Sequence, residues 1–407
     1  MSYLNFLRDN WSFLLAGVIL TFSSSYGQTF FISIFADQIK AAHGLTDGGW
    51  GLSYTIATTA SAVLMIWAGA LTDRFRIRAL AIFVMIGLAV ACLMMTQAPA
   101  VWWLVLTVFL LRFTGQGMLS HLAVVAMARW FVATRGKALS IASIGFSIGT
   151  AFLPIIFAAL LLTTDWRILW LICAAVLLLT IPVVTRLLRQ ERTPQSMAEE
   201  SEALGMDSRH WTRAEVLRHP VFWLLVPALL GPPAWGTALW FQQVHIADVK
   251  GWSHVAFVAL FPLSTAVTVA ATFGCGWAID RFGSARILPF YMLPFAVAFF
   301  VIGAASTIFM AAVGLAVLGI GQGIQSTLAS AFWAEFFGTR HLGAIKAAAG
   351  AIMVFGSAIG PGISGVIIDL GVNFPTQMIW LTLYFLFAAG LCMVCARIVH
   401  PRLTRPL

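Results

Sequence analysis

The chain has 407 residues, of which 60% are hydrophobic and only 10% are charged, and its formal net charge is +9. An average soluble domain is about 45–50% apolar and about 25% charged, so 24 Lys/Arg and 15 Asp/Glu residues cannot cover a soluble fold of this size. The composition excludes a soluble enzyme, a disordered scaffold and a nucleic-acid-binding module. The excess of Lys and Arg over Asp and Glu is therefore interpreted first in terms of membrane topology.

Twelve apolar runs are long enough to cross a bilayer as helices, which takes about 20 residues each. They are centred near residues 24, 60, 88, 115, 150, 176, 234, 265, 295, 320, 355 and 385. The first run begins near Trp11 and is too long for the apolar region of a signal peptide, so we interpret it as a retained span. We expect an all-α integral membrane protein with twelve transmembrane helices.

Lysine and arginine are unevenly distributed between the loops. With the N-terminus inside, 20 of the 24 fall on cytoplasmic segments, Lys40, Arg167 and Lys250 fall outside, and Arg112 stays within a span. This asymmetry is the positive-inside rule. We expect an inner-membrane protein with both termini in the cytoplasm, in contact with anionic lipid and without a nucleic-acid partner.

The longest polar stretch divides the spans six and six. It predicts a six-helix half at residues 1–188, a cytoplasmic linker at 189–219 and a second six-helix half at 220–407. The last part of the linker, Arg213–Arg218, is either a short amphipathic helix at the membrane surface or part of a solvated connection.

The two halves repeat four motifs. Gly69-Ala70-Leu71-Thr72-Asp73-Arg74-Phe75 recurs as Gly276-Trp277-Ala278-Ile279-Asp280-Arg281-Phe282, Gly115-Gln116-Gly117 as Gly321-Gln322-Gly323, Thr134-Arg135 as Thr339-Arg340, and Pro154 as Pro361. The offsets are 207, 206, 205 and 207 residues. Such a constant offset indicates a duplication, and parallel six-helix repeats are an architecture of transporters.

At these motifs the sequence resembles the major facilitator superfamily. The G-x-x-x-D-R-F blocks are similar to its cytoplasmic loop signature, and Arg112-x-x-Gly115-Gln116-Gly117 is similar to its span 4 signature. Arg76 departs from the first pattern, which has glycine there, and the antiporter signature of span 5 is incomplete because Pro154 lacks a preceding glycine. The resemblance implies two pseudo-symmetric halves and alternating access.

Two other motifs have simpler interpretations. Asp47–Gly51 resembles the opening signature of monocarboxylate transporters, but it precedes span 2 rather than span 1, and a helix start with Thr46 or Asp47 as N-cap also explains it. The Cys392/Cys395 spacing is either a redox pair or apolar filler, and we favour filler because both cysteines lie inside an apolar run.

Arg112 is the one ionisable side chain expected near the middle of the membrane, where such residues are costly and therefore candidates for function. Its planar fork suits a carboxylate or phosphate, and Gln116 lies one turn away. The resemblance also implies a structural alternative, in which the guanidinium is bonded to the backbone or side chains of the first span. His121, further toward the cytoplasm, either takes part in proton coupling or makes an interhelical hydrogen bond.

The resemblance implies that spans 1, 4, 7 and 10 line the substrate cavity. Span 7 contains Gly231-Pro232-Pro233, which should bend or break the helix. With Arg112 and Gln116, the polar and aromatic residues of these spans form the predicted substrate-binding set: Tyr26, Gln28, Trp235, Trp240, Gln322 and Gln325. Each of them also has a structural interpretation, since such side chains join helices without any ligand.

A charged cluster is expected on the cytoplasmic side. The resemblance places the start of span 3 near that of span 11, and we predict that these charges close the inner vestibule when the outside is open. The predicted gate comprises Asp73, Arg74, Arg129, Arg135, Asp280, Glu335, Arg340 and Lys346.

These features predict a monomeric secondary transporter for a small organic solute, anionic or polar, coupled to protons or driven by the solute gradient. The sequence contains no G-x-x-x-x-G-K-[ST] motif for direct ATP drive, and neither enzymatic activity, a cofactor nor a metal is expected. The alternatives are an exporter of amphipathic compounds, favoured by 16 Trp and 32 Phe, and a membrane receptor that no longer transports.

Overall fold

The computed structural model describes residues 3–69, 71–97, 99–131, 135–189, 204–338 and 340–403. Within these ranges, the side chains of residues 3–5, 73, 74, 128, 129, 135, 136, 330 and 343 lie outside the description. The contacts divide the chain into two compact units, Met1–Glu199 and Glu200–Leu407. Each unit is described by itself, and all regular elements of the described residues are helices.

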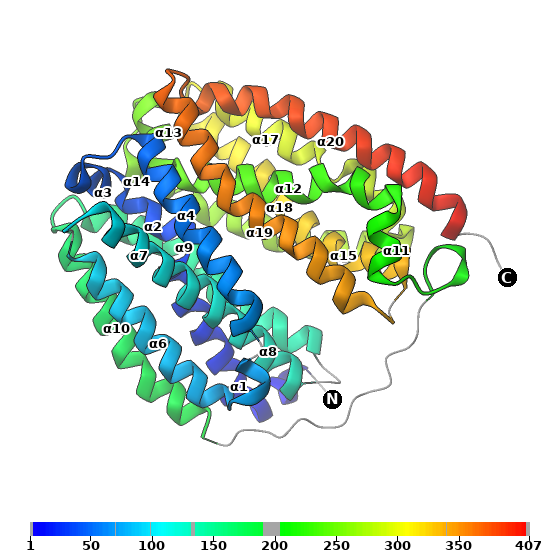
Figure 1. The fold of residues 1–407 in the computed structure, drawn as a ribbon, viewed down its shortest axis with the longest axis horizontal. Coiled ribbons are helices and arrows are strands. Elements are labelled where there is room, and N and C mark those ends of the chain that lie inside the picture. The colour runs from blue at the N-terminus through cyan, green and yellow to red at the C-terminus, as the bar shows by residue number, and fades with distance from the viewer. Residues whose placement is uncertain are drawn as a thin grey trace. The chain divides into compact units, whose positions relative to one another are not determined.

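In its described residues, the N-terminal unit contains one broken span and five continuous spans; Figure 1 shows their helices. Its elements are α1 (Tyr3–Ser24), η1 (Ser25–Gly27), α2 (Thr29–Ile32), η2 (Ser33–Phe35), α3 (Ala36–His43), α4 (Asp47–Ala68), α5 (Leu71–Arg74), α6 (Ile77–Met95), α7 (Val101–Leu111), η3 (Arg112–Leu119), α8 (Ser120–Trp130), α9 (Arg135–Leu160) and α10 (Trp166–Leu187).

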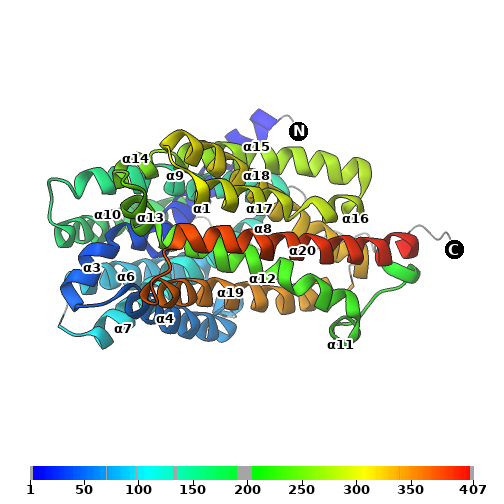
Figure 2. The ribbon, with the colours of Figure 1, turned by 90° about the horizontal axis from the view of Figure 1, so that it is seen from above.

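The C-terminal unit contains the longest helices of the described chain. Its elements are η5 (Met206–Ser208), α11 (Arg213–Arg218), α12 (Pro220–Phe241), α13 (Gln243–Lys250), α14 (His254–Val258), α15 (Phe261–Phe282), α16 (Ser284–Ile287), η6 (Leu288–Phe290), α17 (Leu293–Ala304), α18 (Ile308–Phe337), α19 (Leu342–Asp369) and α20 (Phe374–Leu403). Helices α12 and α20 lie side by side in this unit (Figure 2).

In the described residues, eleven helices are long and apolar enough to span a membrane, and a twelfth span results if the bent pair Phe6–Gly27 and Thr29–His43 is counted as one. Their outer faces carry large apolar side chains, such as Phe273 at 70% exposure and Phe309 at 74%. A continuous apolar exterior is stable only in lipid. The predicted all-α, multi-pass membrane fold is confirmed.

The same three helix pairings occur in both units. In the N-terminal unit α1 packs on α9, α4 on α7 and η3, and α6 on α10. In the C-terminal unit the corresponding pairs are α12 with α19, α15 with α18, and α17 with α20. The duplication inferred from the motif offsets is therefore repeated in the packing.

Local sequence features explain where several helices begin and how closely they approach. Thr46 caps α4, its side chain accepting a hydrogen bond from Gly49 N at 3.0 Å, as the sequence predicted. In α9, a Cβ on Gly145 would lie 2.0 Å from Val18 O. Only glycine permits that approach of α9 to α1.

The sequence predicted a bend or a break at Pro232 and Pro233, and α12 continues through both prolines without a break. Proline at 232 deprives Ala228 O of its usual donor, and the hydroxyl of Tyr291 donates to that oxygen at 3.5 Å. One neighbouring tyrosine thus helps to satisfy the backbone that proline disturbs. The hydroxyl of Tyr384 donates to the preceding carbonyl, Pro227 O, at 2.7 Å.

Candidate functional site

The helix break lies in the first span, at Ser25–Gln28. Gln28 has an extended backbone (φ −87°, ψ 152°), and the two helical parts meet at 50°. Phe31 N donates to Gln28 O at 3.1 Å instead of to Gly27 O. A helical Gly27 would have received that bond, so its carbonyl oxygen needs another donor in an environment without water.

Arg112 supplies that donor. Its Nη1 donates to Gly27 O and to Thr29 Oγ1, each at 3.2 Å. The guanidinium lies over the ring of Tyr54, 5.3 Å from its centroid, and the hydroxyls of Tyr54 and Thr29 share a hydrogen bond of 2.5 Å. The side chain is only 1% exposed. These contacts match the structural interpretation of Arg112; a role as substrate ligand stays a prediction.

The backbone around Arg112 is a π-helix, Arg112–Leu119, between α7 and α8. Such segments are rare and frequently occur at functional sites. Here the π-helix touches the break of the first span through two glycines: a Cβ on Gly115 would lie 2.7 Å from Gly27 Cα, and one on Gly27 would lie 2.1 Å from Leu111 O. The span 4 motif therefore joins two irregular segments by backbone contact.

The other predicted residues of the N-terminal unit lie around this junction. Tyr26 is 4% exposed and packs edge-on against Phe31 at 5.3 Å, and Gln28 is buried. Gln116 and His121 are partly exposed. A Cβ on Gly69 would lie 3.5 Å from Nε2 of His121. The structure thus brings Tyr26, Gln28 and Arg112 to one junction, and His121 faces the end of α4.

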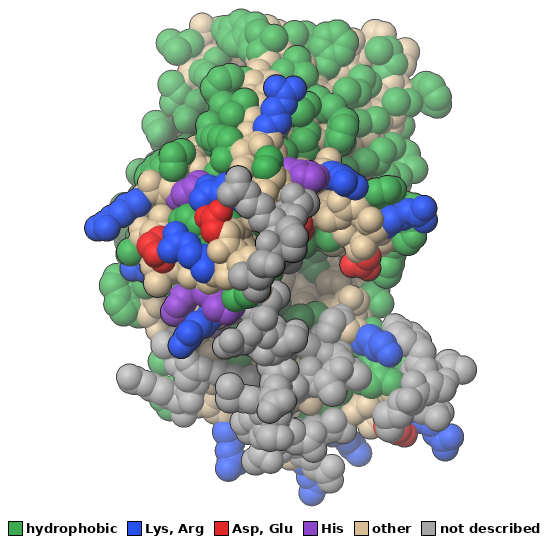
Figure 3. All heavy atoms as spheres, turned by 90° about the vertical axis from the view of Figure 1, so that its right-hand side faces the viewer, with side chains coloured by type: hydrophobic (Ala, Val, Ile, Leu, Met, Phe, Trp, Pro, Cys, Tyr) green, Lys and Arg blue, Asp and Glu red, His purple; other side chains and the backbone are tan. Residues whose placement is uncertain are grey.

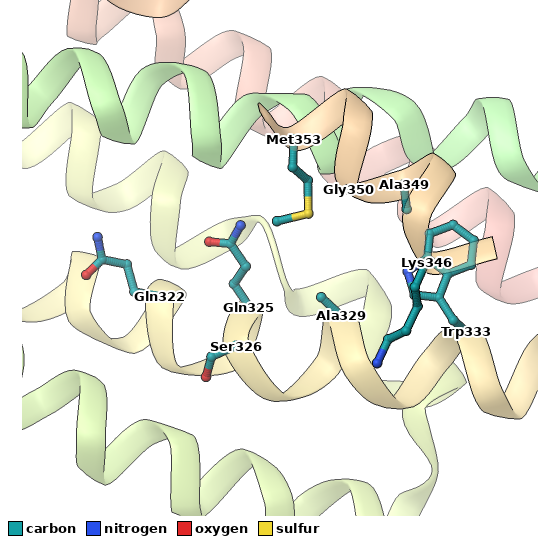
Figure 4. Close-up of a pocket in the computed structure, with 9 residues that line it drawn as sticks. All are labelled: Gln322, Gln325, Ser326, Ala329, Trp333, Lys346, Ala349, Gly350 and Met353. Atoms are coloured by element: carbon teal, nitrogen blue, oxygen red, sulfur yellow. The ribbon is translucent and has the colours of Figure 1, made fainter. Parts of the chain in front are cut away.

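A pocket of about 370 Å³ lies between α18 and α19 of the C-terminal unit (Figure 4). This volume falls within the range of small-molecule sites, about 300–1,000 Å³. Two residues of the predicted substrate-binding set, Gln322 and Gln325, line the pocket together with Ser326 and Met353. Gln325 and Met353 point toward each other from the two helices (Figure 4).

The other end of the pocket carries Lys346 and Trp333. Lys346 extends from α19 toward α18 beside the indole of Trp333 (Figure 4). Trp333 is 2% exposed and packs on Phe332 at 4.4 Å, which holds its ring as a wall. The sequence placed Lys346 in the cytoplasmic gate, and the structure brings it into one pocket with the two glutamines.

Trp235 and Trp240 do not line this pocket. Trp235 packs edge-on against Tyr384 at 6.1 Å, and Trp240 against Phe261 at 4.7 Å. Both are partly exposed, and their part in substrate binding stays a prediction.

The predicted gate is described only in part. The side chains of Asp73, Arg74, Arg129 and Arg135 lie outside the description. Asp280 and Arg340 are exposed. Glu335 Oε2 accepts a hydrogen bond from Ser284 N at 2.8 Å. This bond caps the start of α16, so the described contact of Glu335 lies within the C-terminal unit.

A polar cluster ties the segment before α12 to the end of α20. Arg402 donates to both carboxylate oxygens of Asp207, at 3.0 and 2.5 Å, and its Nη1 lies 2.9 Å from His219 Nε2. The other nitrogen of His219 accepts from Val221 N at 3.2 Å and caps α12. Charged and histidine side chains gather on the corresponding end of the surface (Figure 3).

Both ring nitrogens of His219 face N–H donors, so a second ring proton is unfavourable. Burial, and then the charge of Arg402, lower the pKa of His219 below its ordinary value; Asp207 opposes this shift. Residues 204–219 fall within the predicted linker, yet α11 is a helix with a capping box between Thr212 and Glu215. The end of the predicted linker therefore has defined structure in the C-terminal unit.

Sequence reasoning missed three features of these sites. In the sequence, Tyr54 is an ordinary tyrosine of an apolar span, and Trp333 is one of many aromatic residues. The π-helix has no sequence signature beyond its glycines. A signal for the pocket was available in α18, where Gln322, Gln325, Ala329 and Trp333 follow the spacing of one helix face. Among the described residues, no group of three or more His, Cys, Asp or Glu side chains is arranged to hold a metal.

Comparison with known proteins gives a consistent result. A family model described as the Major Facilitator Superfamily matches residues 17–290 and 263–406. Over 167 residues, or 40% of this chain, the sequence is 28% identical to the multidrug resistance protein B homolog of Mycobacterium tuberculosis, in strains CDC 1551 and H37Rv. The match spans 29% of the length of those relatives.

Solved structures show the same fold. A bacterial homolog to the human lysosomal transporter Spinster, in an inward-facing and unoccupied conformation, has a TM-score of 0.72 at 17% identity, covering 97% of this chain and 98% of that chain. The nucleoside transporter NupG has a TM-score of 0.68 at 16% identity, covering 97% and 100%.

Proposed function

The chain belongs to the major facilitator superfamily, and on that premise we propose that it is a secondary transporter that moves a small anionic or polar organic solute across the inner membrane by alternating access. The family assignment supports a transporter rather than an enzyme. The observation that carries the choice of solute is the pocket between α18 and α19, which combines the amide of Gln325 with the ammonium of Lys346.

The chemistry of this pocket favours a solute with hydrogen-bonding groups and a negative charge. Glutamine both donates and accepts hydrogen bonds, and lysine only donates. Lys346, by contrast, offers an anionic solute a counter-charge, and none of the described residues that line the pocket is an aspartate or glutamate. Trp333 offers a flat apolar wall that suits the carbon skeleton of an organic molecule.

From the N-terminal unit we propose that Arg112 acts chiefly by positioning. Its bonds to Gly27 and Thr29 fix the break of the first span, and that break places Tyr26 and Gln28. Gln116 and His121 are partly exposed, which leaves them accessible to a solute or to a proton. In this proposal His121 is the group that couples transport to protons, since an imidazole can both accept and donate a proton.

A gate at the cytoplasmic ends of the helices completes the proposal. Asp73 in the first loop motif and Asp280 in the second occupy equivalent positions of the two repeats, and each is followed by an arginine, Arg74 or Arg281. Opposite charges at such positions would close the inner side in one state and separate in the other. The orientation, with both termini in the cytoplasm, rests on the distribution of Lys and Arg.

Export of amphipathic compounds is the second candidate. It is favoured by the partial similarity to a protein described as a multidrug resistance protein B homolog and by the many aromatic residues of the chain. The two candidates differ in charge preference, because amphipathic drugs are commonly cations and the pocket presents a lysine.

A thermal-shift screen of the purified protein against organic acids, sugars, nucleosides and amphipathic cations separates the candidates, because a ligand stabilises the state that it binds. The stabilising compound is then offered, radiolabelled, to proteoliposomes. Saturable flux of an acid or neutral polar solute supports the proposal. Flux restricted to amphipathic cations supports export, and binding without flux identifies a receptor.

A further inference from the structure

The pocket between α18 and α19 has two chemically different ends. On α18 its lining follows one face of the helix from Gln322 to Trp333, and on α19 one face from Lys346 to Met353. Two facing stripes of this kind flank an elongated, partly open space. The amides lie at one end of it and the ammonium lies at the other (Figure 4).

The amide end is already partly organised. Gln322 Oε1 lies 3.5 Å from the hydroxyl of Thr268, and Ser326 Oγ lies 3.2 Å from that of Thr272, so α15 supports both side chains. In the described part of the chain the Gln325 amide has no hydrogen-bond partner. It can therefore both donate to and accept from a hydroxyl, carbonyl or amide group of a ligand.

The middle of the pocket is lined by Ala329, Ala349 and Gly350. A Cβ on Gly350 would meet no heavy atom within 4 Å, so the space beside this glycine is open. Small side chains leave room for a chain of carbon atoms, and they offer it no hydrogen bonds.

The helix geometry sets the distance between the two ends. Gln325 and Trp333 are eight residues apart on α18, which corresponds to about 12 Å at the rise of an α-helix. Lys346 reaches back from the level of Trp333 toward Ala329 (Figure 4), so its ammonium lies closer to the Gln325 amide than Trp333 does.

We propose that this pocket binds a ditopic organic anion, with its carboxylate at Lys346 and Trp333, an apolar middle beside Gly350, and a hydroxyl, carbonyl or amide group at Gln325. The inference rests on the proposed function and deepens it, because it gives the solute a length and two specified ends.

A series of ω-hydroxycarboxylates tests the length and both ends. Binding of glycolate, ω-hydroxyhexanoate, ω-hydroxyoctanoate and ω-hydroxydodecanoate to the full chain in neutral detergent is measured by isothermal titration calorimetry. Affinity should be highest for the hexanoate or octanoate. Octanoate, which lacks the hydroxyl, and octanediol, which lacks the carboxylate, should each bind about 10–100-fold more weakly, the ratio expected for a lost charged or buried hydrogen bond.

Substitutions at three positions locate the site. Lys346→Met should weaken ω-hydroxyoctanoate about 10–100-fold and leave octanediol unchanged, whereas Lys346→Arg should retain most of the affinity. Gln325→Leu should remove the preference for ω-hydroxyoctanoate over octanoate. Gly350→Leu should abolish binding of the whole series, since it fills open space without a backbone clash. Lys137→Met, at an exposed lysine of the N-terminal unit, is the control and should bind normally.

Affinity that is independent of chain length, or unchanged in both Lys346→Met and Gly350→Leu, would overturn the proposal. So would displacement of the acids by phosphatidylglycerol with no length preference, which would assign Lys346 to a lipid headgroup. If another solute enters proteoliposomes at a rate that these variants do not change, the ditopic site is refuted but the proposed transport function is not. Absence of flux for every solute that binds would instead refute the transporter.

Discussion

Arg112 and Thr29 should be energetically coupled, because the guanidinium uses the threonine hydroxyl to hold the broken first span. Each of the two bonds from Nη1 is 3.2 Å long, longer than an ideal charge-assisted bond of about 2.7–2.9 Å. We therefore take the lower end of the range for charged hydrogen bonds, about 1.5 kcal/mol each.

Arg112→Met removes both bonds and should cost about 3 kcal/mol. Thr29→Val removes one acceptor and the bond to Tyr54. In the double variant the Arg112–Thr29 bond is lost only once, so the coupling energy should be about 1.5 kcal/mol. The assay is equilibrium unfolding in mixed micelles, with tryptophan fluorescence reporting the free energy of unfolding.

The matched control is Thr107→Val. Thr107 is also fully buried, but its hydroxyl donates within its own helix, to Trp103 O at 2.8 Å, so it should couple to Arg112 by less than about 0.5 kcal/mol. Equal coupling for Thr29 and Thr107 would refute the idea that Arg112 anchors the break. The same result would favour the alternative interpretation, in which Arg112 binds the solute.

Three further experiments test other parts of the structure. Gly145→Ala should lower the melting temperature in differential scanning fluorimetry, because its Cβ would lie 2.0 Å from Val18 O. Gly350→Ala should leave the melting temperature unchanged or raise it, since its Cβ meets open space and alanine is a better helix former than glycine. Similar shifts for both variants would contradict the described packing. The pKa of His219 is lowered in the folded protein, so between that pKa and the unfolded value of about 6.5 the unfolded chain binds more protons. The free energy of unfolding should therefore fall as the pH drops through this window. His219→Asn should flatten the dependence of the unfolding free energy on pH, and an unchanged dependence would assign the pH sensitivity to another group. Asp73→Asn should slow transport and raise cysteine labelling from the cytoplasmic side with little loss of folding, and unchanged labelling would count against the gate.

Much of the fold could be predicted from the sequence because lipid imposes a simple rule. A helix that crosses a bilayer needs about 20 apolar residues, so the spans are visible as apolar runs. The repeated Asp73 and Asp280 motifs reveal the duplication by their offset alone. Both signals are local or periodic, and neither depends on how side chains pack.

The irregular parts could not be predicted in the same way. Gly231-Pro232-Pro233 indicated a bend or a break. Helix α12 has no break there, and the hydroxyl of Tyr291 reaches the carbonyl that Pro232 leaves without a donor. The real break, before Thr29, carries no proline. It is stabilised by Arg112 from 83 residues away, and no local pattern records such a contact.

The candidate sites show the same division. Gln322 and Gln325 were recognisable as polar residues of an apolar span, and both line the pocket. Lys346 was assigned to a gate because its depth suggested contact with cytoplasmic water. Its place beside Trp333 depends on the register between α18 and α19, which only tertiary packing determines.

Counterflow in proteoliposomes tests the central claim most directly. Vesicles loaded with the unlabelled solute that most stabilises the purified protein are diluted into the same solute carrying a radiolabel. The account predicts a saturable, transient accumulation of label for an organic acid or polar solute, which is strongly reduced in Gly350→Leu vesicles and normal in Lys137→Met vesicles. Tight binding of that solute with no accumulation above empty vesicles would contradict the account and identify the protein as a receptor.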